Sequence, residues 1–184
     1  MSQNLTPPVG IVTDQTGIDE VIAIIQERLT TLDWLEVSLG RVRPAIKTAG
    51  GLPEPWIYKE DGESYRAYPN DTLKSFTCLY AHDDETIKNE VFGIRTLSVI
   101  CWANLKTLGI EPPTVEGLKQ QVIRKLLDLY CVLSVNKSFD QTTAGATGIY
   151  PGFDVSGLES SYLSYPYGGF RIELTVHYTN LCNS

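Results

Sequence analysis

The sequence predicts an α+β fold: a mostly antiparallel sheet with two amphipathic helices packed on one face and a long loop or hairpin insertion. Apolar residues recur every three or four positions over 17–31 and 114–133, which is the spacing of a helix with one buried side. Short runs rich in β-branched and aromatic residues lie between these segments. Residues 170–178 alternate between apolar and polar side chains, which indicates a strand with one buried and one solvated face.

The elements are expected in the following order. The first helix covers 17–31, where Asp19 and Glu20 in the first turn complement the helix dipole. Strands are expected at 34–39, 41–47, 56–58, 65–68, 75–81 and 94–103. Asp61-Gly62 favours a hairpin turn between 56–58 and 65–68, and 82–89 is expected to be a charged connection. Thr114 is a suitable N-cap for the second helix, over 114–133.

The chain is expected to form a single domain over residues 16–184, preceded by an N-terminal arm over 1–15 that contains Pro7-Pro8. Its 184 residues include 15 Lys and Arg against 22 Asp and Glu, a net charge of −7, which argues against a free-standing nucleic-acid-binding protein. No apolar stretch approaches the ~18 residues that a membrane span needs, so no membrane partner is expected.

No motif in the sequence predicts a catalytic residue, a cofactor or a metal site. The four cysteines form no C-x-x-C pair, and no glycine-rich segment has the pattern of a phosphate-binding loop. His82 precedes three consecutive acids, but adjacent acids in a loop converge poorly on one ion, so a solvated loop is expected there. His177 falls on the solvated face of the last strand. We therefore expect a protein that is not an enzyme.

Two regions are candidates for interaction. Residues 134–169 hold four charges but six glycines and six aromatic residues, a mixture typical of adaptable binding loops. The segment is interpreted either as a protein-contact arm or as an extra hairpin packed on its own domain. The candidate interface residues are Phe139, Tyr150, Phe153, Tyr162, Tyr165 and Tyr167.

The second region is the acidic stretch 54–90, with nine acids against four bases. It is either a solubilising rim or a surface that faces a basic partner or repels a like-charged one. The candidates for an acidic surface of this kind are Glu60, Asp61, Glu63, Asp83, Asp84 and Glu85.

The element order resembles that of the small α+β proteins that form rings at the neck and upper tail of tailed bacteriophages, the group of tail terminator, tail-completion and head–tail connector proteins. The resemblance covers 16–180 as an architecture: a first helix, a strand meander, a second helix and a closing strand. Two segments are also similar to that group, Tyr68-Pro69-Asn70-Asp71 with Ser75-Phe76, and Ile94 followed by Val99-Ile100-Cys101-Trp102-Ala103-Asn104-Leu105.

The resemblance implies a structural virion protein, located at the neck or tail and assembled in the host cytoplasm. It implies a homo-oligomeric ring, a hexamer or dodecamer, that contacts neighbouring neck or tail proteins and encloses DNA only as passing cargo. The acidic candidates would then line the lumen, where they would repel the phosphates of a moving duplex.

Two alternatives remain open on the residues alone. One is a soluble α+β ligand-binding or enzymatic domain with a pocket lined by tyrosines of 150–167, with His82 or His177 alongside. The other is an adaptor that binds one partner through the tyrosine-rich segment. A monomer with an enclosed pocket would favour the first alternative, and a ring would favour the phage interpretation.

Overall fold

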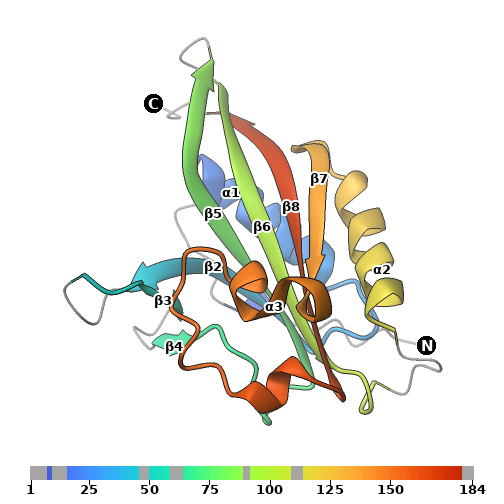
Figure 1. Cartoon of the computed structure of the whole chain (residues 1–184). Coiled ribbons are helices and arrows are strands. Elements are labelled where there is room, and N and C mark those ends of the chain that lie inside the picture. The colour runs from blue at the N-terminus through green and yellow to red at the C-terminus, as the bar shows by residue number, and fades with distance from the viewer. Residues whose placement is uncertain are drawn as a thin grey trace.

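The computed structural model describes residues 8–9, 16–45, 50–58, 64–88, 92–108 and 114–179 (Figure 1). In chain order the elements are β1 (Pro8–Val9), α1 (Ile18–Leu29), β2 (Val37–Ala45), β3 (Glu54–Tyr58), β4 (Ser64–Arg66), β5 (Ser75–Lys88), β6 (Phe92–Asn104), α2 (Val115–Leu127), β7 (Val132–Asp140), α3 (Gln141–Ile149), the 3-10 helix η1 (Ser160–Leu163) and β8 (Tyr167–Thr179).

The described strands form one sheet in the order β4-β3-β2-β5-β6-β8-β7, with β1 beside β2. The pairs β1–β2 and β2–β5 are parallel and every other neighbouring pair is antiparallel. The predicted α+β class with a mostly antiparallel sheet is confirmed. None of the helices in the described part of the chain is both long and apolar enough to cross a membrane.

Both predicted helices pack on one face of this sheet. Ile25 and Leu29 of α1 and Val122 and Leu126 of α2 are fully buried, in one core with alternate residues of β5, β6 and β8. The helix expected over 17–31 is confirmed as α1. The helix expected over 114–133 ends earlier, at Leu127, because the chain turns before β7 begins. Buried Leu129 and Cys131 continue the apolar spacing through that turn, which explains the overestimate.

A second core lies on the opposite face, under α3 and η1. It contains Ile57, Phe76, Ile100 and Trp102 of the sheet together with residues of the 134–169 segment. The first half of β8 is consequently buried on both faces, and Arg171, expected in water, is 5% exposed. Beyond it the predicted alternation holds from Ile172 to Tyr178.

Three expectations for the strands need correction. The segments 34–39 and 41–47 join into the single strand β2, and β5 continues through 82–88, which was expected to be a connection. The hairpin of 56–58 and 65–68 is confirmed as the antiparallel pair β3–β4, although its turn lies outside the described residues. Within the expected arm, Pro8–Val9 pairs with β2, and the remaining residues of 1–15 also lie outside the described part.

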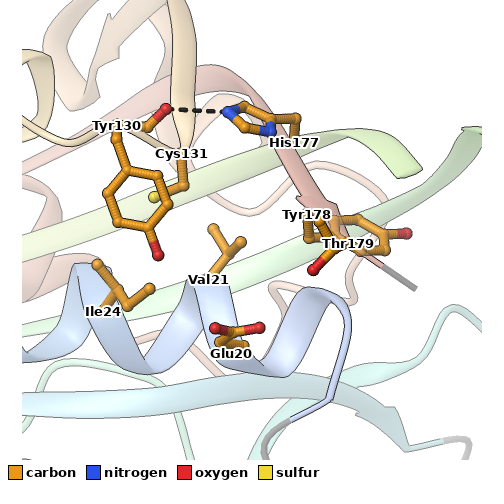
Figure 2. Close-up of a pocket in the computed structure, with 8 residues that line it drawn as sticks. All are labelled: Glu20, Val21, Ile24, Tyr130, Cys131, His177, Tyr178 and Thr179. Carbon is orange, nitrogen blue, oxygen red and sulfur yellow. Dashed lines mark hydrogen bonds between the residues drawn. The ribbon is translucent and has the colours of Figure 1, made fainter. Parts of the chain in front are cut away.

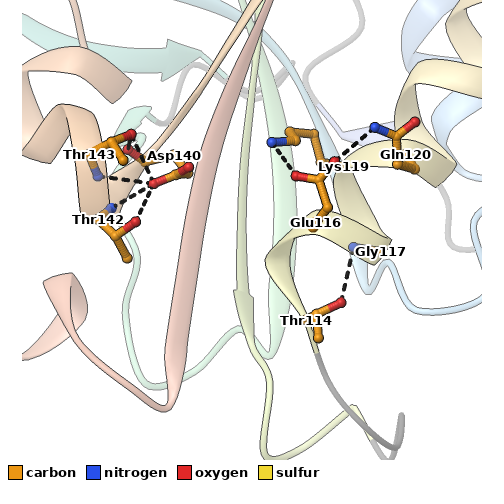
Figure 3. A network of polar contacts seen from close by, with 8 residues as sticks. All are labelled: Thr114, Glu116, Gly117, Lys119, Gln120, Asp140, Thr142 and Thr143. Atoms are coloured by element: carbon orange, nitrogen blue, oxygen red, sulfur yellow. Dashed lines mark hydrogen bonds and ion pairs between the residues drawn. The ribbon is translucent and has the colours of Figure 1, made fainter.

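Side chains cap both α2 and α3 at their N-termini (Figure 3). The Thr114 hydroxyl accepts a hydrogen bond from the amide of Gly117 at 3.1 Å. The Asp140 carboxylate accepts from the amides of Thr142 and Thr143, each at 3.0 Å. The Thr142 hydroxyl, which also donates to this carboxylate, and the two amide bonds hold the pKa of Asp140 below its ordinary value.

We expect Asp140→Ala to lower the free energy of unfolding by about 1 kcal/mol, the usual effect of losing such a cap. Asp140→Asn should retain most of the stability, because asparagine caps equally well. The pKa of Asp140 is lower in the folded protein than in the unfolded chain. The charged carboxylate therefore makes its full contribution to the free energy of unfolding above the ordinary pKa of Asp140. This contribution is lost as the pH falls through the lower, folded-state pKa. Urea titrations of both variants at several pH values measure this difference, and identical pH profiles would contradict it.

Candidate functional site

A small pocket opens between α1 and the end of β8 (Figure 2). It has about 60 Å³ of free space, enough for a few water molecules, and is lined by Glu20, Val21, Ile24, Tyr130, Cys131, His177, Tyr178 and Thr179. The Nε2 atom of His177 donates to the carbonyl oxygen of Tyr130 at 2.9 Å. Burial raises the pKa of the Cys131 thiol, which keeps it protonated. The pocket therefore offers neither the volume of a ligand site nor an activated nucleophile.

The structure places most of the six candidate interface aromatics against their own domain. Tyr150, Phe153 and Tyr162 are buried in the second core. Phe139 and Tyr167 are half-buried, and Tyr165 is 70% exposed. The interpretation of 134–169 as a hairpin packed on its own domain therefore describes the segment better than a free arm. For the three buried residues, the expected role in contacting a partner must be corrected.

Hydrogen bonds fix this segment to the connection between β4 and β5. The Tyr150 hydroxyl donates to the carbonyl of Ala67 at 2.5 Å, and its ring meets that of Tyr68 edge-on at 5.4 Å. The Tyr167 hydroxyl donates to the carboxylate of Asp71 at 2.7 Å. No tyrosine-lined ligand pocket is formed by Tyr150 or Tyr162, because their rings fill the space themselves.

Next to this core, a polar row crosses β5, β6 and β8. The Nε2 atom of His82 lies 2.8 Å from the Ser98 hydroxyl, to which Arg171 also donates at 3.1 Å. Arg171 further donates to the Gly148 carbonyl at 2.8 Å and pairs with Glu173 at 3.2 Å. A serine beside a histidine resembles a nucleophile and its base, but Ser98 is fully buried, so no substrate can reach it.

His82 should make stability depend on pH. Burial lowers the pKa of His82 below its ordinary value of 6.5. The positive charge of Arg171 lowers this pKa further, whereas the negative charges of Asp84 and Glu173 raise it. As the pH falls, His82 is therefore protonated in the unfolded chain before it is protonated in the folded protein. Its contribution to the free energy of unfolding is fully present above pH 6.5 and declines as the pH falls below that value. We expect His82→Gln to reduce this decline, which one proton limits to about 1.4 kcal/mol per pH unit. Unfolding free energies from pH 7.5 to 5.5 measure it, and parallel curves would contradict the assignment.

The acidic candidates divide into two groups. Glu60, Asp61 and Glu63 lie outside the described residues. Asp83, Asp84 and Glu85 lie on β5 rather than in a loop, all are exposed, and each contacts a residue of another strand. Asp83 pairs with Arg95 at 3.5 Å, Asp84 accepts from Thr96 at 2.6 Å, and Glu85 accepts from the hydroxyl of Tyr178. In the described residues no group of three His, Cys, Asp or Glu side chains could hold a metal ion.

Within the described residues, the four neighbouring strands β5, β6, β8 and β7 have a free edge on each side, in addition to the edges at β4 and β1. Strand β2 pairs with β5 only up to Leu79, so 82–88 of β5 has a strand neighbour on one side alone, β6. At the other end of the sheet, β7 pairs only with β8. Figure 1 shows β5, β6 and β8 running side by side, with β7 on the far side of β8. Unpaired edges are sites where another chain can add by backbone hydrogen bonding. Neither edge was predicted from the sequence.

Comparison with known proteins gives one distant relative. A protein of Chromohalobacter salexigens named "Solute-binding protein" is 26% identical over 164 residues, which are 88% of this chain and 47% of the relative. The chain thus spans about half the length of that protein. No family model matches the sequence, and no solved structure matches it. The name of the relative agrees with the ligand-binding alternative and not with a phage ring.

Proposed function

We propose that this chain is a structural protein that assembles with copies of itself into a ring, at the neck or upper tail of a tailed bacteriophage, through which DNA passes. The observation that carries the proposal is that β5 and β7 each have a free edge, on opposite sides of the four strands β5, β6, β8 and β7. These edges belong to different strands, so edge-to-edge contact is head to tail, and a head-to-tail contact repeated by rotation closes into a ring.

The directions of the strands fit this arrangement. The neighbours β5, β6, β8 and β7 alternate in direction, so β5 and β7 run opposite ways. A copy rotated about an axis along the strands would place its β5 antiparallel to the β7 of the first copy. The sheet would then continue from copy to copy, as in a barrel that has no free edge.

One face of the sheet suits the outer surface of a ring, and the other suits the wall of its lumen. Helices α1 and α2 cover one face. The other face carries the polar row of His82, Ser98 and Glu173, followed by Asp84 and Thr175 beyond the cover of α3. Carboxylates on a lumen wall would repel the phosphates of DNA and keep it from adhering. The resemblance in element order points to the same role.

Electron microscopy of the purified protein tests the proposal. Negatively stained particles should be rings with a stain-filled centre, and they should not retain duplex DNA at moderate salt. A uniform population of single small particles would contradict it.

Solute binding is the second candidate, and the name of the relative favours it. That protein is about twice as long, so a site could require residues beyond those in this chain. Thermal unfolding with a panel of sugars, amino acids and organic acids tests it. A solute at 100 times its Kd stabilises a protein by about 2.7 kcal/mol, a rise of several degrees in Tm. A monomer stabilised in this way would replace the ring proposal, and an unchanged Tm across the panel would count against solute binding.

A further inference from the structure

Arginine and aromatic side chains gather on one face of the strands β2, β3 and β4. The register places Arg43 of β2 opposite Trp56 of β3, and Trp56 opposite Arg66 of β4. Side chains of residues paired in this way lie on the same face of a sheet, about 5 Å apart at their Cβ atoms. Tyr58 lies two residues after Trp56 on β3, so it belongs to the same face. We call this set the arginine–aromatic patch: Arg43, Trp56, Tyr58 and Arg66.

The patch points away from the core that supports it. Val42 of β2 and Ile57 of β3 are buried in the second core, and successive side chains of a strand point to opposite faces. Tyr58 is 50% exposed, and the side chains of Arg43 and Arg66 are each 42% exposed. Figure 1 shows β2 and β3 at the side of the sheet away from α2 and β7. Another molecule can therefore reach these side chains without opening the core.

The arginines of this region are only partly neutralised. Arg41 and Arg43 both lie against Asp19 of α1, with nitrogen–oxygen distances of 3.0 and 3.7 Å. Arg66 pairs with Glu54 at 3.1 Å. In these ion pairs of the described residues, three guanidinium groups share two carboxylates. A distance of 3.7 Å is longer than an N–H···O hydrogen bond, so the donors of Arg43 can serve a further carboxylate.

Trp56 is held in position within the patch. Its Nε1 atom donates to the carboxylate of Glu54 at 3.1 Å, and the guanidinium of Arg66 lies 5.8 Å from the centre of its ring. These contacts orient the ring in advance, so binding against it costs little side-chain entropy. Tryptophan, tyrosine and arginine are also the residue types that contribute most to affinity at protein interfaces.

A protein segment that carries a carboxylate fits this patch better than a nucleic acid does. Affinity for nucleic acid grows with the number of phosphates that Lys and Arg neutralise. Here three guanidinium groups against two carboxylates leave an excess of one positive charge, on a chain whose net charge is −7. One carboxylate, in contrast, can form two parallel hydrogen bonds with Arg43. An apolar side chain beside that carboxylate would then reach Trp56 and Tyr58 on the neighbouring strand.

We propose that the arginine–aromatic patch is a docking surface for an acidic segment of another protein. An Asp or Glu side chain of that segment binds Arg43, and a neighbouring apolar or aromatic side chain packs on Trp56 and Tyr58. The patch is separate from the free edges of β5 and β7. The proposal therefore goes beyond the ring and holds for a ring and for a monomer alike.

Selection from a library of random short peptides on the purified protein tests this docking surface. The enriched peptides should contain Asp or Glu next to an aromatic or apolar residue. In fluorescence anisotropy, Arg43→Ala and Tyr58→Ala should each weaken their binding about tenfold or more, the effect of losing a central interface residue. The matched controls are Arg28→Ala, at a side chain that is 37% exposed, and Tyr165→Ala, at a residue that is 70% exposed. Both controls should bind the peptides as tightly as the wild type.

A conservative variant separates docking from folding. Arg43→Lys keeps a positive charge beside Asp19 but cannot form the two parallel hydrogen bonds of a guanidinium, so it should still weaken binding. The proposal is overturned if no peptide is enriched, if the enriched peptides lack acids, or if Arg43→Ala and Tyr58→Ala bind them as tightly as the wild type. Labelled single-stranded oligothymidylate is the second probe and should not bind. Binding of this probe that both alanine substitutions abolish would make a nucleic acid the occupant instead.

Discussion

Tyr150→Ala is expected to lower the free energy of unfolding by about 3–5 kcal/mol, the range for deleting a buried aromatic ring. The ring is fully buried and lies parallel to that of Trp102 at 6.4 Å. Its loss would open a cavity in the core that joins the 134–169 segment to the sheet and leave the Ala67 carbonyl without its donor. Chemical denaturation followed by tryptophan fluorescence measures the change.

Two variants of the same segment serve as controls. Tyr150→Phe retains the ring and removes only the hydroxyl, so a loss of about 1 kcal/mol is expected. Tyr165→Ala removes an exposed ring and should change stability by less than about 0.5 kcal/mol. Equal effects of Tyr150→Ala and Tyr165→Ala would mean that the segment is not part of the core.

Glu173→Gln is expected to lower the free energy of unfolding by about 2–3 kcal/mol, somewhat less than at a fully buried ion pair. The guanidinium of Arg171 is almost entirely buried and remains charged, and Glu173 supplies its counter-charge. Its other contacts, the Gly148 carbonyl, the Ser98 hydroxyl and the ring of Phe139, carry no net charge. Urea denaturation at pH 7 measures the loss.

The matched control is Glu159→Gln, at an exposed carboxylate, which should have no measurable effect. Adding Arg171→Met to Glu173→Gln should recover part of the loss, because the unpaired buried charge is then removed. If Glu173→Gln were as stable as the wild type, the pair would have no role in holding α3 against β8.

The helices and the central strands could be predicted because their burial is one-sided. Ile25 of α1 and Val122 of α2 face a core while their neighbours face water, which gives the 3.6-residue period directly. Strand β6 was evident for a different reason, since it lies between two strands and is rich in β-branched residues.

The acidic half of β5 could not be predicted, because both of its faces are in water there. A strand exposed on both faces has no alternation, and His82-Asp83-Asp84-Glu85 has the composition of a loop. Its structure comes from pairing with β6. The unpaired edges could not be predicted from the sequence either, because pairing between strands that are distant in the chain leaves no local sequence pattern.

The 134–169 segment was ambiguous because its aromatic rings suit a binding surface and a core equally well. Helix α3 has two glycines, and Gly145 adopts a positive φ of 62° that interrupts the helix, so no periodicity marks it. One signal was present: Asp140 followed by two threonines is typical of a helix N-cap.

The mass of the purified protein in solution, measured by light scattering over a wide range of concentrations, tests the ring most directly. The ring predicts a mass that is a fixed multiple of 20.4 kDa, six or twelve copies, and that persists on dilution. A mass of 20.4 kDa at every concentration would contradict the ring and leave solute binding as the function to test.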